Sequence, residues 1–283
     1  MEFLELVIYM VILKTYYYME ETGRKNSFER FPYLRALTER IDDQALERRE
    51  VEGSAQAHRY RILAARLGED DVLTTALDLS LAAMHVPEFG AYLNYYTGNR
   101  VTIQLAFELQ GVFCPAFEEI SYRLKQIQKI CRVDRKKGLL LSAELEGENE
   151  LYAYLTGSDI PPQSTGALEY FSWKSRLHRP FIREELIKKG TDCLRKKGIW
   201  QISGAGGRRF LAKCAAKTLK MNLLIVDLKS GNEIFETGVC DFFMRAARIA
   251  FLWEAIVCVG GITKELLSDW KMTETKRLPT FPK

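Results

Sequence analysis

Glycines and arginines are grouped in one short stretch of the chain, and their order suits the binding of an anion. Residues 199–213 read IWQISGAGGRRFLAK, so that Gly204, Gly206 and Gly207 are followed at once by Arg208 and Arg209. Glycines let the backbone wrap closely around an anion, and the N–H groups at the start of a helix point toward it. The stretch therefore indicates a phosphate-binding loop.

The spacing of this loop departs from the P-loop pattern G-x-x-x-x-G-K-[ST]. That pattern has four residues between its glycines, then a lysine for the β- and γ-phosphates and a hydroxyl for magnesium. Here two residues separate Gly204 from Gly207, and Arg208 and Arg209 take the places of the lysine and the hydroxyl. A planar guanidinium is not equivalent to a compact ammonium, and Arg209 brings no magnesium ligand. Phosphate binding is expected here, and bound magnesium is not.

The other residue types that carry chemistry indicate no second site. The six cysteines form no C-x-x-C pair and the three histidines are scattered, so neither a metal site nor a Cys–His pair is expected. Asp227 ends an apolar run, a position where aspartate is typical of a turn. No residue is assigned a catalytic role.

The elements around the loop alternate between apolar strands and helices. Residues 199–202, 223–226 and 255–259 are predicted strands, with one helix over residues 208–219 and another within residues 232–253. Near-continuous apolar strands separated by helices are typical of a parallel sheet covered on both faces. We expect a three-layer α/β domain over residues 166–283, after the linker PPQSTG at residues 161–166.

The part of the chain before the linker has helical periodicity. Residues 57–165 are predicted to form a helical domain, preceded over residues 1–56 by an N-terminal helix and a charged connector. The apolar run at residues 6–13 is too short to span a bilayer and follows Glu2 and Glu5. We expect it to be a buried helix in a cytoplasmic protein. A helix that binds a partner or lies on a membrane is the alternative.

Four segments together resemble one protein family. SGAGGRRFLAKCAAKTLKMNLLIVDL (residues 203–228) resembles the phosphate loop, helix and second strand of bacterial AAA+ ATPases. The helical, winged-helix-like N-terminal region of one subgroup is similar to three further stretches. These are ARLGEDDVLTTALDLSLA (residues 65–82), FGAYLNYYTGNRVTIQLAFEL (residues 89–109) and LLLSAELEGENELYAYLTGSD (residues 139–159). The resemblance implies that Gly204, Gly206, Gly207 and Arg208 hold the phosphates of ATP. It also implies a mostly α domain followed by a P-loop domain.

Parts of the ATPase machinery have no counterpart in the sequence. Gly260 and Gly261 stand where the acidic pair that holds magnesium and activates water is expected. Only 86 residues follow Lys197, fewer than a complete module needs, so a partial module is expected. The resemblance thus implies an AAA+ homologue with impaired or absent hydrolysis. It would act by interaction or scaffolding, through a protein partner or self-association.

The distribution of charge leaves a second class of function open. The composition, 47% hydrophobic and 28% charged, excludes a mainly disordered chain, and the net charge of +4 is mild. Between Ser172 and Lys220, however, 14 basic and three acidic residues give +11, which leaves −7 for the rest. Trp173, Phe181 and Trp200 lie among these charges. A nucleic-acid-binding helical protein using residues 172–220 is the alternative function, and a solvated helix face is the alternative interpretation of the charges.

Overall fold

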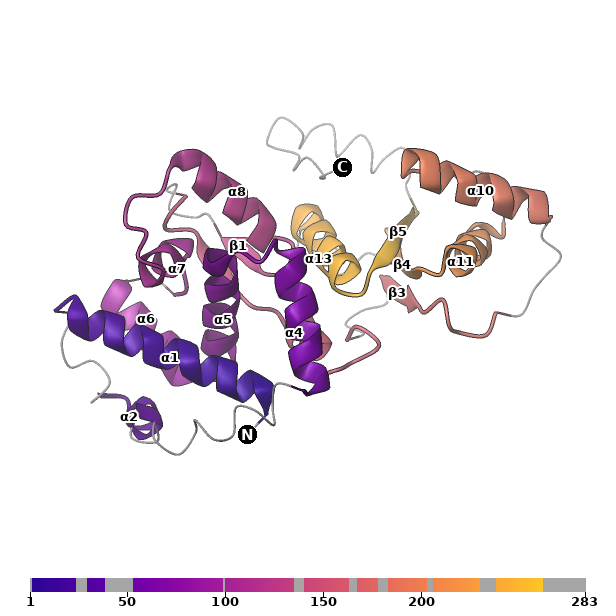
Figure 1. Ribbon diagram of the computed structural model, residues 1–283. Coiled ribbons are helices and arrows are strands. Elements are labelled where there is room, and N and C mark those ends of the chain that lie inside the picture. Colours follow the sequence, from indigo (N-terminus) through magenta and orange to yellow (C-terminus); the bar gives the residue numbers. More distant parts are fainter. Residues whose placement is uncertain are drawn as a thin grey trace. The chain divides into compact units, whose positions relative to one another are not determined.

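The computed structural model describes residues 2–23, 30–38, 53–98, 100–134, 140–162, 167–177, 183–202, 206–229 and 238–261. The chain folds as two compact units, Met1–Pro162 (unit 1) and Gln163–Lys283 (unit 2), which are shown in Figure 1. Each unit is described by itself.

Unit 1 consists of helices and one small hairpin. Its helices are α1 (Phe3–Glu21), α2 (Pro32–Thr38), α4 (Ala55–Arg66), α5 (Asp71–His85), α6 (Pro87–Thr97), α7 (Ile103–Leu109), α8 (Phe117–Ile127) and α9 (Asn149–Leu155). Strands β1 (Arg132–Asp134) and β2 (Glu144–Glu146) pair antiparallel. The helical character predicted from the periodicity is confirmed.

Helix α5 is the central element of unit 1, because α1, α6, α7, α8 and β2 all pack against it. Asp70 and Asp71 give its start two carboxylates, which suit the positive end of the helix dipole. The Asp70 carboxylate accepts hydrogen bonds from the N–H groups of Val72 at 3.0 Å and Leu73 at 3.1 Å. Arg123 of α8 donates to the same carboxylate at 2.9 Å. One residue thus caps α5 and ties α8 to it.

The N-terminal apolar run forms α1, which packs against α5. Its buried side chains lie along most of its length: Leu4, Leu6, Ile8, Tyr9, Val11, Ile12, Leu13, Thr15 and Met19. The expectation of a buried helix is therefore confirmed. Within the described parts of the chain, no helix is both long and apolar enough to cross a membrane.

A polar pair joins α4 to α5 inside unit 1. The Tyr60 hydroxyl donates a hydrogen bond to the Asp78 carboxylate. Burial raises the pKa of Asp78 to about 7, although the Tyr60 hydrogen bond and the charge of Lys14 both lower it. Burial also raises the pKa of Tyr60 well above its usual value, with a further contribution from Asp78. Asp78 therefore titrates near neutral pH.

Unit 2 contains a three-stranded sheet between helices. Its elements are β3 (Leu168–Phe171), α10 (Glu184–Lys197), α11 (Arg208–Leu219), β4 (Asn222–Asp227), α13 (Val239–Leu252) and β5 (Ala255–Gly260). The strand order is β3-β4-β5, and β4 pairs antiparallel with β3 and parallel with β5. Helices α11 and α13 both pack on β4 and β5, and Figure 1 shows them on opposite sides of these strands.

The sheet corrects the prediction of parallel strands throughout. Residues 199–202 form no strand, and the place beside β4 is occupied instead by the antiparallel β3, which the sequence analysis missed. Residues 199–202 are held by α10. The carbonyl of Ile199 accepts a hydrogen bond from the Cys193 thiol at 3.1 Å, and the ring of Trp200 packs against Gly190. The parallel arrangement holds for β4 and β5 only.

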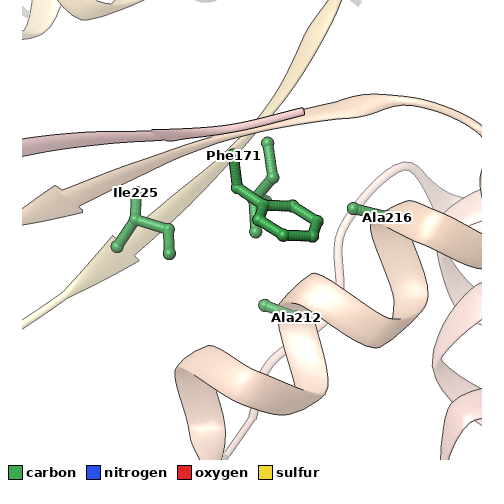
Figure 2. Packing of buried hydrophobic residues seen from close by; sticks show 5 residues of the cluster. Phe171, Ala212, Ala216 and Ile225 are labelled. Atoms are coloured by element: carbon green, nitrogen blue, oxygen red, sulfur yellow. The ribbon is translucent and has the colours of Figure 1, made fainter. Parts of the chain in front are cut away.

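The core on the α11 side of the sheet is small and closely packed (Figure 2). It consists of Phe171, Ala212, Ala216, Leu223 and Ile225. The alanines of α11 let the helix approach β4 closely, and the ring of Phe171 from β3 fills the space beside them. The edge strand β3 therefore supplies the largest side chain of this core.

We expect Gly190→Ala to destabilise unit 2, although alanine normally favours a helix over glycine. A Cβ atom at residue 190 would lie 2.3 Å from the nearest ring atom of Trp200, so the ring or α10 must move. The expected loss is about 1–3 kcal/mol in the free energy of unfolding, measured with urea. Lys189→Ala, at the exposed neighbouring position, is the control. A gain in stability for Gly190→Ala would contradict this packing.

We expect Asp78→Asn to stabilise unit 1 increasingly as the pH rises from 4 to 7. The native state holds the Asp78 proton up to about pH 7, whereas the unfolded state releases it near the ordinary aspartate pKa of 3.8. The contribution of Asp78 to the stability of the unchanged protein therefore falls with rising pH in this window, by up to about 1.4 kcal/mol per pH unit. Unfolding curves at several pH values measure the difference. Asp71→Asn, on the exposed first turn of α5, should show no such growth.

Candidate phosphate-binding site

Helix α11 begins at a glycine and has an open first turn. Gly207 is its N-cap residue, with φ of +72°, a left-handed conformation that favours glycine. The first bond of the helix runs from the Leu211 N–H to the Gly207 carbonyl at 2.9 Å. No side chain among the described residues caps this end. The N–H groups of Arg208, Arg209 and Phe210 therefore point outward, where they can receive an anion.

This helix end lies at the carboxyl edge of the two parallel strands. Arg209 donates to the carboxylate of Asp227, the last residue of β4. The Lys229 N–H donates to Asp227 Oδ1 at 3.1 Å, which is the turn expected from the sequence. Gly261, just after β5, lies against the same carboxylate oxygen. Ligands of open α/β sheets bind at such edges, beyond the carboxyl ends of the strands.

The predicted site residues differ in what they contact. Gly206, Gly207 and Arg208 are exposed at this edge, and no atom lies within 4 Å of a Cβ built on either glycine. Arg208 makes no ion pair with any described residue, so its charge is available to a ligand. Arg209, in contrast, is engaged with Asp227. Gly204 lies outside the described residues.

The pair between Arg209 and Asp227 joins the first turn of α11 to the end of β4. The Asp227 side chain is 18% exposed and that of Arg209 52%. The charge of Arg209 also reaches Cys258 on β5: burial raises the pKa of the Cys258 thiol, and Arg209 lowers it. The sequence analysis did not find this pairing, nor the positions of Lys229 and Gly261. The only sign of the Arg209–Asp227 pair in the sequence is an arginine in the first turn of a predicted helix and an aspartate at the end of the next predicted strand.

The donor set at this edge does not fit magnesium. Magnesium takes oxygen ligands in octahedral geometry and is usually bound by one or two carboxylates. Asp227 supplies a carboxylate, but Arg209 and the Lys229 N–H occupy its oxygens, and β5 ends in glycines. In the described ranges, no group of three His, Cys, Asp or Glu residues could hold a metal ion.

Comparisons with known proteins give no relative. No protein-family model matches the chain, and neither curated proteins nor solved structures provide a match. The assignment of a function therefore depends on the geometry of the site and on the sequence patterns.

We expect Arg209→Gln to slow the alkylation of Cys258 at a given pH. Removing the guanidinium leaves burial as the main influence on the thiol, so its pKa must rise and the reactive thiolate must become scarcer. The rate can be followed by mass spectrometry of the peptide that contains Cys258. Arg208→Gln removes the same charge from the preceding residue, and it should leave the rate of alkylation nearly unchanged. Equal rates in all three proteins would show that Arg209 does not act on Cys258.

Proposed function

We propose that the chain is a homologue of bacterial AAA+ ATPases that binds the phosphates of ATP and hydrolyses it poorly or not at all. The observation that carries this proposal is the open, glycine-started first turn of α11 at the carboxyl edge of β4 and β5. Arg208 would contact the phosphates by a charge-assisted hydrogen bond. The backbone N–H groups that follow Gly207 would supply the remaining contacts.

The order of elements around the loop supports the same proposal. Glycine-rich loop, α11, β4, α13 and the parallel β5 follow one another as the family resemblance implies. The antiparallel β3 and the absence of a strand at residues 199–202 depart from it. The resemblance is therefore strongest from Gly206 to Gly260, the part that forms the site.

Impaired hydrolysis follows from the groups that surround the site. Phosphoryl transfer requires a metal that bridges the phosphates and a residue that orients the attacking nucleophile. Arg209 stands where a magnesium-binding hydroxyl is expected, and it neutralises Asp227. Gly260 ends β5 and Gly261 follows it, and neither has a side chain that could hold a metal or orient water. Binding without turnover is what these groups can support.

The fold of unit 1 supports a winged-helix-like domain. Helices α5, α7 and α8 are followed by the β1–β2 hairpin, and Thr102 forms an isolated antiparallel bridge with Glu144 of β2. The Leu145 N–H donates to the Val101 carbonyl at 2.8 Å. Helices followed by a small antiparallel pair of strands suit the helical, winged-helix-like region that the resemblance implies.

An exposed apolar surface on unit 1 supports a role in protein interaction. The turn from α7 to α8 presents Phe113, 68% exposed, and α8 presents Phe117, 67% exposed. Val112 and Tyr122 add to the exposed apolar area, beside the acidic Glu118 and Glu119. Exposed aromatic residues are enriched in protein-binding surfaces. A partner protein or a second copy of the chain would be the occupant.

We expect the chain to bind a fluorescent ATP analogue weakly and with no gain from magnesium. Arg208→Ala should weaken this binding by roughly tenfold, the effect of one lost charge-assisted hydrogen bond. Lys220→Ala, at the opposite end of α11, is the matched control and should bind as the unchanged protein does. Fluorescence titrations with and without magnesium measure all three.

Two results would contradict the proposal in different ways. No binding at any concentration would remove nucleotide from the function of this chain. Binding that magnesium strengthens strongly, together with phosphate release, would show that the site holds a metal despite the pairing of Asp227 with Arg209.

A further inference from the structure

The two units carry charges of opposite sign. Unit 1 has 19 basic and 25 acidic residues, a net charge of −6, whereas unit 2 has 22 basic and 12 acidic residues, a net charge of +10. The phosphate-binding site needs only a small part of this excess. The rest of the positive charge on unit 2 calls for a different explanation.

Several basic side chains of unit 2 have structural contacts within the unit. Arg209 is paired with Asp227, and Lys213 is paired with Glu169 of β3. Lys217 donates to the Ser175 carbonyl at 2.8 Å. All three belong to α11 and hold it to the sheet or to the segment after β3. They are therefore not available to a partner.

Among the described residues, the basic side chains of α10 have no such contacts. Five are exposed, namely Lys188, Lys189, Arg195, Lys196 and Lys197. The three acids of α10 precede Lys188, Lys189 and Lys196 by four residues, the spacing of helical ion pairs, yet no such pair forms among the described residues. The charges of α10 do not serve to stabilise the helix in this way.

The placement of α10 turns these charges outward. The helix packs on α11, and its buried residues are Thr191 and Gly190, which lies against the ring of Trp200. By the 3.6-residue period, Lys189 and Lys196 lie on the opposite side of the helix, and Lys188 and Arg195 lie on its flank. From Lys188 to Lys197 the helix rises roughly 14 Å, and that length of duplex carries about eight phosphate charges.

We propose that the exposed face of α10 binds the phosphate backbone of a nucleic acid. The basic side chains are spread along a helix rather than gathered around one point, which suits a linear polyanion better than a single phosphate group. The face carries few groups that could read bases, so the binding is independent of sequence. This surface is separate from the site at Arg208, and the proposal does not rest on ATP binding. Phe181 lies outside the described residues.

The test is the binding of the full chain to a fluorescently labelled DNA duplex of about 30 base pairs, by anisotropy, between 50 and 200 mM salt. The logarithm of the binding constant should fall linearly with the logarithm of the salt concentration. The triple variant Lys188→Gln, Lys189→Gln, Lys196→Gln should bind at least tenfold more weakly at 50 mM salt. Its salt slope should be smaller by about 3, because each contact contributes about 0.9.

Matched variants separate the α10 face from other surfaces. A second triple variant removes the same amount of charge from unit 1. It combines Arg100→Gln, Lys125→Gln and Lys129→Gln, and its affinity should stay within about twofold of that of the unchanged protein. Arg208→Ala should also retain DNA binding, which distinguishes this proposal from the nucleotide site. Unchanged unfolding curves for the α10 variant would show that the loss of affinity is not a loss of fold.

Three outcomes would overturn the proposal. The first is no binding to duplex at 50 mM salt, and the second is equal affinity of the α10 variant and the unit 1 variant. The third is competition by polyglutamate as effective as that of unlabelled DNA at equal charge, which would assign the face to an acidic protein.

Discussion

The contact between α11 and the sheet is the constraint on which the rest of unit 2 depends. Ala212 and Ala216 bring the helix close to β4, and Phe171 fills the space at their side. A helix packed this closely has its start fixed relative to the ends of the strands. Gly207 and the open N–H groups after it are therefore held at the carboxyl edge of β4 and β5, beside Asp227. The position of the candidate site is a consequence of packing several residues away from it.

The pair between Arg209 and Asp227 shows how one contact can serve the fold and restrict the chemistry. It ties the start of α11 to the end of β4, which strengthens the same helix–sheet contact. It also uses a carboxylate that could otherwise hold a metal, and it places a permanent cation where magnesium is expected. An anion can still reach the N–H groups and Arg208. This arrangement suits the anion binding that we propose better than the transfer of a phosphoryl group.

The basic segment that stands out in the composition divides into two parts with different roles. On α11, the basic side chains that face the sheet have acidic or carbonyl partners and belong to the fold. On α10, one layer further from the sheet, five basic side chains are exposed without ion pairs among the described residues. Charge counted along the sequence cannot separate these parts, because the partners of Arg209 and Lys213 lie 18 and 44 residues away.

The sequence by itself determined the features that depend on neighbouring residues. Asp70 at the start of α5, the apolar residues of α1, and the glycines before α11 all act within a turn or two, so local patterns identify them. Only the tertiary structure decided which strands pair. Leu168–Phe171 takes the place beside β4, while Trp200 packs against Gly190 and keeps residues 199–202 out of the sheet. Pairing and close packing join residues distant in the chain, and no local pattern specifies which of several apolar segments will meet.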